Sequence, residues 1–88
     1  MSVEQLLQQA PSGLSSKDTA YLLVNPQGRY FCRLGAYSRK NKTFAVHTAW
    51  SLAGAKMFGM TASIYDLAKR EPKIKNFNVV KLTLSSLQ

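Results

Sequence analysis

Acidic residues are scarce in this sequence. Its 88 residues contain 4 Asp and Glu against 12 Lys and Arg, which gives a net charge of +8. No acid occurs between Asp18 and Asp66. A catalytic site built on paired carboxylates is therefore not expected. The surplus of cations instead favours acidic partners, through a long-range attraction that salt screens.

Cysteine and histidine are almost absent, with Cys32 and His47 as the single examples. One cysteine cannot form an intramolecular disulfide, and the two residues cannot build a Cys and His metal site, so we expect no metal and no cofactor. His47 has no carboxylate nearby in sequence to orient it as a base. Cys32 alternates with Tyr30 and Leu34 along an expected strand, as a small core residue does. We therefore expect a protein without catalytic activity.

Long apolar runs are also missing, since none approaches the roughly 20 residues of a membrane span. The N-terminus is polar and carries an acid where a secretory signal carries cations. The lone cysteine suits a reducing compartment, so we expect a cytoplasmic protein that does not associate with membranes. A length of 88 residues with 45% hydrophobic side chains predicts one compact domain, 1–88, with a short helix and linker over 1–19 and the core over 20–84.

Two segments carry helical patterns, in which apolar side chains recur every three or four positions. In residues 2–10, Ser2 and Gln5 are placed as a capping box. In residues 61–70, Thr61 is placed as the N-cap. The first pattern predicts a short N-terminal helix and the second predicts the main helix.

Four segments rich in aromatic and branched residues predict strands, and the first two flank a turn with the sequence NPQG. Together with the helices they predict an α+β fold, in which a small antiparallel sheet of three N-terminal strands plus one C-terminal strand packs with one main helix and a short N-terminal helix. The predicted strands cover residues 20–25, 29–34, 42–48 and 76–84.

A glycine-broken segment, residues 50–60, precedes the main helix and is rich in large apolar side chains. We expect these side chains to pack in the core, with one or two of them as exposed anchors of an interface as the alternative. The side chains are those of Trp50, Met57, Phe58 and Met60.

Part of the sequence follows a pattern of short motifs. The pattern consists of Gly-Arg-Tyr at residues 28–30, Trp-Ser at 50–51, Ala-Lys-Met-Phe at 55–58 and Val-Val-x-Leu-x-Leu at 79–84. It resembles small proteins common in bacteriophage genomes, in which a strand pair leads to a Trp-Thr or Trp-Ser turn, a half-helix, an amphipathic helix and a closing strand. The resemblance covers roughly residues 21–84. It implies an accessory protein of a phage or mobile element, and it carries over no enzymatic activity and no site residues.

The stretch RLGAYSRKNKTF, residues 33–44, holds four basic side chains and no acid, and we expect it to form the tip between the second and third strands. Aromatic residues alternate with these cations, as on surfaces that stack single-stranded bases. Because the cations and aromatics continue back to the start of the second strand, we treat the whole hairpin as the candidate site. The candidate binding residues are Arg29, Arg33, Tyr37, Arg39, Lys40 and Lys42.

Two kinds of partner suit this basic hairpin. The preferred one is an acidic surface on a host protein or protein complex, which a phage-type accessory factor binds and then inhibits or redirects. The alternative is DNA or RNA, held without sequence specificity by cations that neutralise phosphates. The open edges of a four-stranded sheet also permit a homodimer. The sequence alone leaves open whether the acidic group is a carboxylate or a phosphate.

Overall fold

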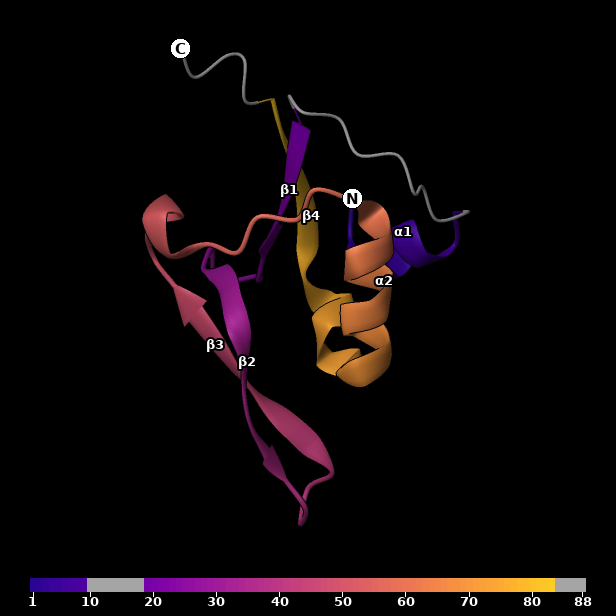
Figure 1. Cartoon of the computed structure of the whole chain (residues 1–88), viewed down its shortest axis with the longest axis vertical. Coiled ribbons are helices and arrows are strands. Elements are labelled where there is room, and N and C mark those ends of the chain that lie inside the picture. The colour runs from indigo at the N-terminus through magenta and orange to yellow at the C-terminus, as the bar shows by residue number, and fades with distance from the viewer. Residues whose placement is uncertain (10–18, 84–88) are drawn as a thin grey trace.

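The computed structural model describes residues 1–9 and 19–83. It shows the predicted α+β fold, a four-stranded antiparallel sheet with one main helix and a short N-terminal helix (Figure 1). The strand order is β3-β2-β1-β4, so the C-terminal strand lies beside the first. No helix in the described residues has the length and apolar character needed to cross a membrane. The elements are α1 (Val3–Leu7), β1 (Thr19–Val24), β2 (Tyr30–Ser38), β3 (Thr43–Ala49), the 3-10 helix η1 (Leu52–Gly54), α2 (Thr61–Arg70), the 3-10 helix η2 (Pro72–Asn76) and β4 (Asn78–Thr83).

The sheet consists of two strand pairs that meet at one point. β1 pairs with β4 over its whole length, and β2 pairs with β3 along the long hairpin. β1 and β2 pair only between Val24 and Tyr30, on either side of the turn that joins them. The β2–β3 hairpin therefore diverges from β1, and its tip projects away from the helices (Figure 1).

A short extended segment before α2 fills the space where β1 and β2 diverge. The amide of Lys56 donates to the carbonyl of Phe31 on β2 at 2.8 Å. Phe58 and Tyr21 of β1 exchange two backbone hydrogen bonds of 2.8 and 2.9 Å. This segment thereby links the hairpin to the rest of the sheet.

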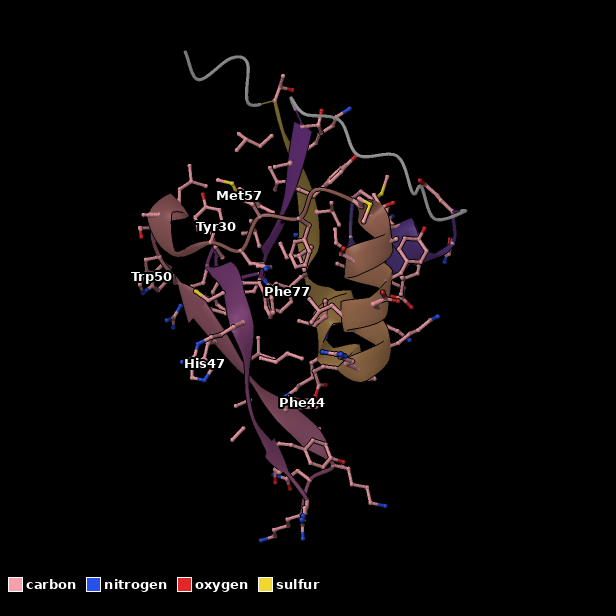
Figure 2. All side chains as sticks on the ribbon, viewed as in Figure 1. Tyr30, Phe44, His47, Trp50, Met57 and Phe77 are labelled. Carbon is pink, nitrogen blue, oxygen red and sulfur yellow. The ribbon has the colours of Figure 1, made fainter. Side chains whose placement is uncertain are left out.

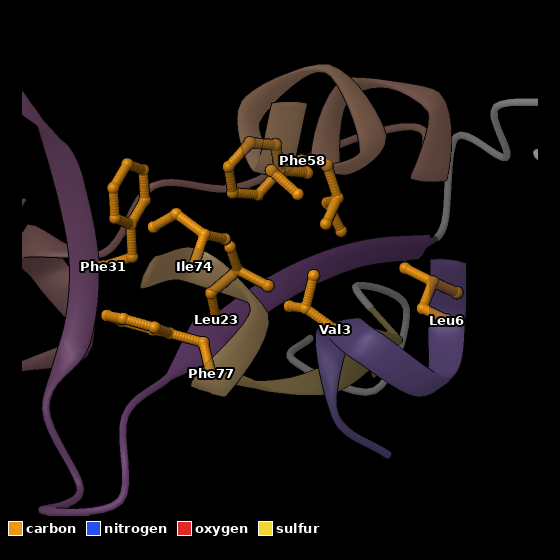
Figure 3. Close-up of a cluster of buried hydrophobic side chains, with 9 residues drawn as sticks. Val3, Leu6, Leu23, Phe31, Phe58, Ile74 and Phe77 are labelled. Carbon is orange, nitrogen blue, oxygen red and sulfur yellow. The ribbon is translucent and has the colours of Figure 1, made fainter. Parts of the chain in front are cut away.

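The core lies between the sheet and the helices and is built from buried apolar side chains of seven elements and connecting segments. Phe31 stacks on Phe58 and meets Phe77 edge-on, each at 6.2 Å between ring centroids, and the three rings converge around Ile74 (Figure 3). The tight contacts among these rings tie the hairpin, the segment before α2 and the start of β4 into one cluster. The buried cluster comprises Val3, Leu6, Leu23, Phe31, Phe58, Ile64, Ala68, Ile74 and Phe77.

Both predicted helices form, but with different ends. The capping box of α1 is confirmed, because Ser2 Oγ accepts from the Gln5 amide at 3.1 Å and Gln5 Oε1 accepts from the Ser2 amide at 2.9 Å. α1 ends at Leu7, earlier than predicted, and residue 10 of the predicted helix lies outside the described residues. α2 has the predicted bounds, but its N-cap is Met60, with no capping side chain. The predicted cap at Thr61 is wrong because that residue is the first of the helix and is buried.

β2 runs beyond its predicted end at residue 34. Its pairing with β3 is irregular between Phe31 and Arg33 and again between Leu34 and Tyr37. β-Bulges of this kind place an extra residue on one strand, disrupt the ladder locally and bend the strand. β2 continues past both irregularities and ends at Ser38.

The first bulge changes which side chains of β2 face the core. Phe31 is buried and Leu34 packs against the cluster, whereas Cys32 is half-buried and outside it, so the predicted core position of Cys32 is wrong. Near the second bulge, a Cβ on Gly35 would lie 2.4 Å from Nε2 of His47. A glycine at this position therefore leaves the space that the imidazole occupies.

β3 and β4 form close to their predicted positions. β3 is shifted by one residue, to Thr43–Ala49. β4 begins at Asn78 instead of residue 76, because η2 carries the chain as a 3-10 helix up to that point and buries Ile74. No helix was predicted for residues 72–76 from the sequence.

Candidate binding surfaces

The connection between β2 and β3 consists of residues 39–42, which we call the hairpin tip. It is shorter than the predicted tip, and its turn is closed by Ser38, whose hydroxyl accepts from the Asn41 amide at 3.3 Å. Lys42 has a φ of 54°, a left-handed conformation that glycine and asparagine adopt more readily than lysine. A lysine at that position adds a cation to the tip at a local conformational cost. The exposed cations of the tip are Arg39, Lys40 and Lys42.

An aromatic pair lies next to the tip. Tyr37 and Phe44 are opposite each other across the hairpin, with ring centroids 4.9 Å apart and an interplanar angle of 57°. Tyr37 is 51% exposed, while Phe44 is half-buried. An exposed aromatic face beside cations, as the sequence predicted, is therefore present at this end of the hairpin.

Two side chains following α2 hold the hairpin at Phe44. Glu71 Oε1 accepts from the Phe44 amide at 2.7 Å, and Lys73 Nζ donates to the Phe44 carbonyl at 2.9 Å. Glu71 Oε2 also accepts from the Lys73 amide at 3.1 Å. These side chains supply to the outer edge of β3 the two hydrogen bonds that a further strand would supply. We call this arrangement the Glu71 clasp.

The Glu71 carboxyl is charged in the folded protein. Its side chain is 1% exposed, and burial raises its pKa, but the hydrogen bonds from the Phe44 and Lys73 amides and the charge of Lys73 outweigh burial. The pKa of Glu71 therefore lies below its ordinary value of 4.5. A buried carboxylate that is satisfied in this way is a structural group, and it contributes little negative charge to the outer surface.

Arg29 and Trp50 form a second surface at the base of the hairpin. The Arg29 guanidinium lies over the Trp50 ring, 4.9 Å from its centroid, and Nη2 donates to the Thr48 carbonyl at 3.4 Å. Trp50 is 69% exposed and Met57 is 46% exposed, so the core positions predicted for these two side chains are wrong. The prediction is confirmed for Phe58, which is 6% exposed.

The exposed positions have a local cause. η1 lies between β3 and the segment that pairs with Phe31, and residues 50–54 around it are all exposed. Figure 2 shows Tyr30, Trp50 and Met57 at the same end of the molecule, away from the hairpin tip. We call this surface the η1 end, and its exposed apolar side chains are Trp50, Leu52 and Met57.

A groove of about 480 Å³ lies between β2 and α2. Its β2 wall is formed by four consecutive residues, 31–34, and its α2 wall by side chains spaced as on one helix face. Three cations, Arg33, Lys56 and Arg70, share this groove with one acid, Asp66. The remaining lining side chains are Phe58, Ser63 and Leu67.

The structure does not bring the six predicted binding residues together. Tyr37, Arg39, Lys40 and Lys42 lie at or beside the hairpin tip, Arg33 lines the groove, and Arg29 stacks on the Trp50 ring at the η1 end. At about 3.3 Å per strand residue, roughly 30 Å separates the two ends of the hairpin. The single basic surface expected from the sequence is therefore three surfaces.

Sequence reasoning missed the clasp and two of the groove cations. Glu71 was not predicted as a site residue, although an acid directly before a proline that starts a new turn is a recognisable capping position. Lys56 and Arg70 were not linked to Arg33, because no local pattern shows that α2 lies opposite β2. In the described residues, no three His, Cys, Asp or Glu side chains are grouped to hold a metal ion.

Comparisons with known proteins do not assign the chain to a family. Searches of protein-family models, curated proteins and solved structures found no match. The function is therefore inferred from the three surfaces of the chain itself.

Proposed function

We propose that this protein is a non-catalytic accessory factor of the phage type, which binds an acidic surface of a host protein complex in the cytoplasm and inhibits or redirects that complex. The phage origin rests on the sequence resemblance over residues 21–84. The binding role is supported chiefly by one observation, the exposed Trp50 side chain stacked with Arg29 at the η1 end.

An exposed tryptophan next to other exposed apolar residues is typical of a protein interface. Tryptophan and arginine are enriched among the residues that contribute most to binding between proteins, and a stacked guanidinium orients both groups before the partner arrives. Leu52 and Met57 add further exposed apolar surface at the same end. Binding to phosphates requires none of these apolar side chains.

The charge of the surface favours an acidic protein partner. In the described part of the chain, the acids with exposed side chains are Glu4 and Asp66, because the third acid, Glu71, is buried in the clasp. Cations lie at the hairpin tip, in the groove and around η2. Such a surface accelerates association with an acidic patch and disfavours basic partners.

Replacing Trp50 by alanine tests this role. We expect the partner captured by the tagged wild-type protein from a nuclease-treated bacterial lysate to bind the Trp50→Ala variant about 30-fold or more weakly, the loss typical of a central interface residue. Val80→Ala is the matched control, because Val80 is also an exposed apolar residue but lies on β4. Equal capture by both variants would contradict a role for Trp50.

The hairpin tip supports a second candidate function, the binding of DNA or RNA without sequence specificity. Three cations of residues 39–42 stand beside the exposed ring of Tyr37 on a projecting hairpin. Cations of this kind neutralise phosphates, and an exposed aromatic ring stacks on unpaired bases.

A triple variant separates this candidate from the first. If nucleic acid is the partner, replacing Arg39, Lys40 and Lys42 by alanine should weaken binding by orders of magnitude at low salt and reduce the slope of log affinity against log salt by about 0.9 for each lost contact to duplex phosphate. Titrations of labelled DNA and RNA at about 50 and 200 mM salt measure both quantities. A control that loses the same charge elsewhere replaces exposed lysines away from the tip, Lys69, Lys75 and Lys81. Equal losses in the two variants would exclude the tip as the site.

A further inference from the structure

We propose that the groove between β2 and α2 receives an extended acidic segment of the protein partner, which adds to the open edge of β2 as a further strand. This inference rests on the proposed function and specifies the chemistry of the partner. Arg33, Lys56 and Arg70 lie outside the hairpin tip and the η1 end, and the inference gives them the role of binding acidic side chains.

The edge of β2 that faces the groove is open. On this side, β2 pairs with β1 only at Tyr30, and the next backbone bond in the described residues is the one from the Lys56 amide to the Phe31 carbonyl. From residue 32 to Ser38, β2 has a strand partner only on its β3 side. An unpaired strand edge is a template for an added strand, and recognition of extended peptides commonly uses such edges.

The lining of the groove shows that the strand edge itself is accessible. Four consecutive residues of β2, 31–34, line the groove, so the groove follows the strand from the point where its pairing with β1 ends. The opposite wall is one face of α2, with lining residues at positions 63, 66, 67 and 70. The volume of about 480 Å³ lies within the range of ligand-binding clefts.

The protein already places one of its own segments in this position. Lys56 hydrogen-bonds to Phe31 on β2, and two residues later Phe58 pairs with β1 in an antiparallel bridge. An extended chain therefore fits between β2 and the helical side of the molecule at the point where the groove begins. The partner segment would continue the same row of pairing along β2 toward Ser38.

The charges and apolar residues of the groove select the occupant. Arg33 lies on β2, Arg70 on α2 and Lys56 on the connecting segment. These three cations outnumber the one acid of the groove, Asp66, and favour acidic side chains. A second copy of the chain would bring its own charge of +8, which disfavours it as the occupant. Nucleic acid finds no stacking platform there, because Phe31 and Phe58 are buried.

An NMR titration with a defined probe tests the inference. The probe is a short peptide of alternating Glu and Val with capped ends, and its partner probe is the same peptide with alternate backbone nitrogens methylated, which keeps the charge but removes strand hydrogen bonds. We expect the first peptide to shift amide signals of residues 32–38 and of the groove face of α2, and the methylated peptide to bind at least ten times more weakly. Absence of binding, or equal binding of both peptides, would overturn strand addition.

Charge reversal in the groove provides the second arm. Arg33→Glu combined with Arg70→Glu should weaken the unmethylated peptide at least tenfold more than the control pair Lys69→Glu and Lys75→Glu, which makes the same change in net charge outside the groove. Equal weakening by the two pairs would show that only the net charge of the protein drives peptide binding, and it would overturn the groove as the site. Shifts of the same amides with rising protein concentration, without peptide, would identify a second copy as the occupant and would also overturn the inference.

Failure of the groove and failure of the proposed function give different results. If the lysate partner is captured by wild type and by the groove variant alike but is lost from Trp50→Ala, the groove inference fails and the proposed function stands. If no protein partner is captured by any form, the proposed function fails. Amide shifts with the peptide would then still show that the groove binds an acidic strand.

Discussion

Replacement of Glu71 by alanine should lower the free energy of unfolding by about 3 kcal/mol, because two charge-assisted hydrogen bonds of about 1.5 kcal/mol each are lost. The backbone amides of Phe44 and Lys73 lose their common acceptor, and the part-buried Phe44 amide is left without its hydrogen bond. Out of a total stability of roughly 5 to 15 kcal/mol, this is a large share. Urea denaturation at neutral pH measures it, and amide hydrogen exchange should accelerate first at Phe44.

The charge of Glu71 should also make the free energy of unfolding depend on pH. Since folding lowers the pKa of Glu71 from 4.5, the stabilisation by its charged form is complete above about pH 4.5 and is lost as the pH falls through the lower pKa of the folded state. Glu71→Gln is the control, because it keeps the volume but carries no charge. The difference in stability between wild type and Glu71→Gln should therefore narrow below about pH 4.5. A constant difference down to about pH 3 would contradict a charged Glu71.

Replacement of Phe58 by alanine should cost about 3 to 5 kcal/mol, the usual range for removing a buried phenylalanine. Phe58 stacks on Phe31 at 6.2 Å, and its backbone pairs with Tyr21. The lost ring would leave a cavity where β1 and β2 diverge, so the hairpin would lose its side-chain contact with the segment before α2. The change should appear as a drop in the thermal midpoint of more than about 10 °C.

Trp50→Ala is the matched comparison for Phe58→Ala, since both remove an aromatic ring from the same glycine-broken segment. Because Trp50 is 69% exposed, its loss should change the free energy of unfolding by less than about 1 kcal/mol while it weakens binding to the partner. Similar destabilisation by the two substitutions would show that Trp50 supports the fold, and it would remove the main support for the η1 end as an interface.

The sequence was sufficient for the fold class because the determining signals are local. The capping box at Ser2 and Gln5, the NPQG turn and the apolar spacing in residues 61–70 each specify an element without knowledge of the rest of the chain. The alternation of Val46 with His47 on β3 likewise appears in the structure as half-buried and exposed side chains.

The candidate site was less predictable because its features depend on contacts between distant segments. The bulges in β2 arise from its pairing with β3, and Cys32 lies outside the core cluster that Phe31 and Leu34 contact. The position of Trp50 outside the core depends on how η1 leaves the sheet, and the clasp joins Glu71 to Phe44 across 27 positions of the chain. Side-chain periodicity carries no information on such long-range contacts.

The most direct test of the central claim, that an acidic protein surface is the partner, is the composition and mass of the captured complex after nuclease digestion. Light scattering during size-exclusion chromatography gives the mass, and the ratio of absorbance at 260 and 280 nm reports any nucleic acid. We expect a protein complex of fixed stoichiometry that survives nuclease and loses this protein when Trp50 is replaced by alanine. Release of every partner by nuclease would contradict the claim and would indicate that the basic hairpin binds the phosphates of nucleic acid.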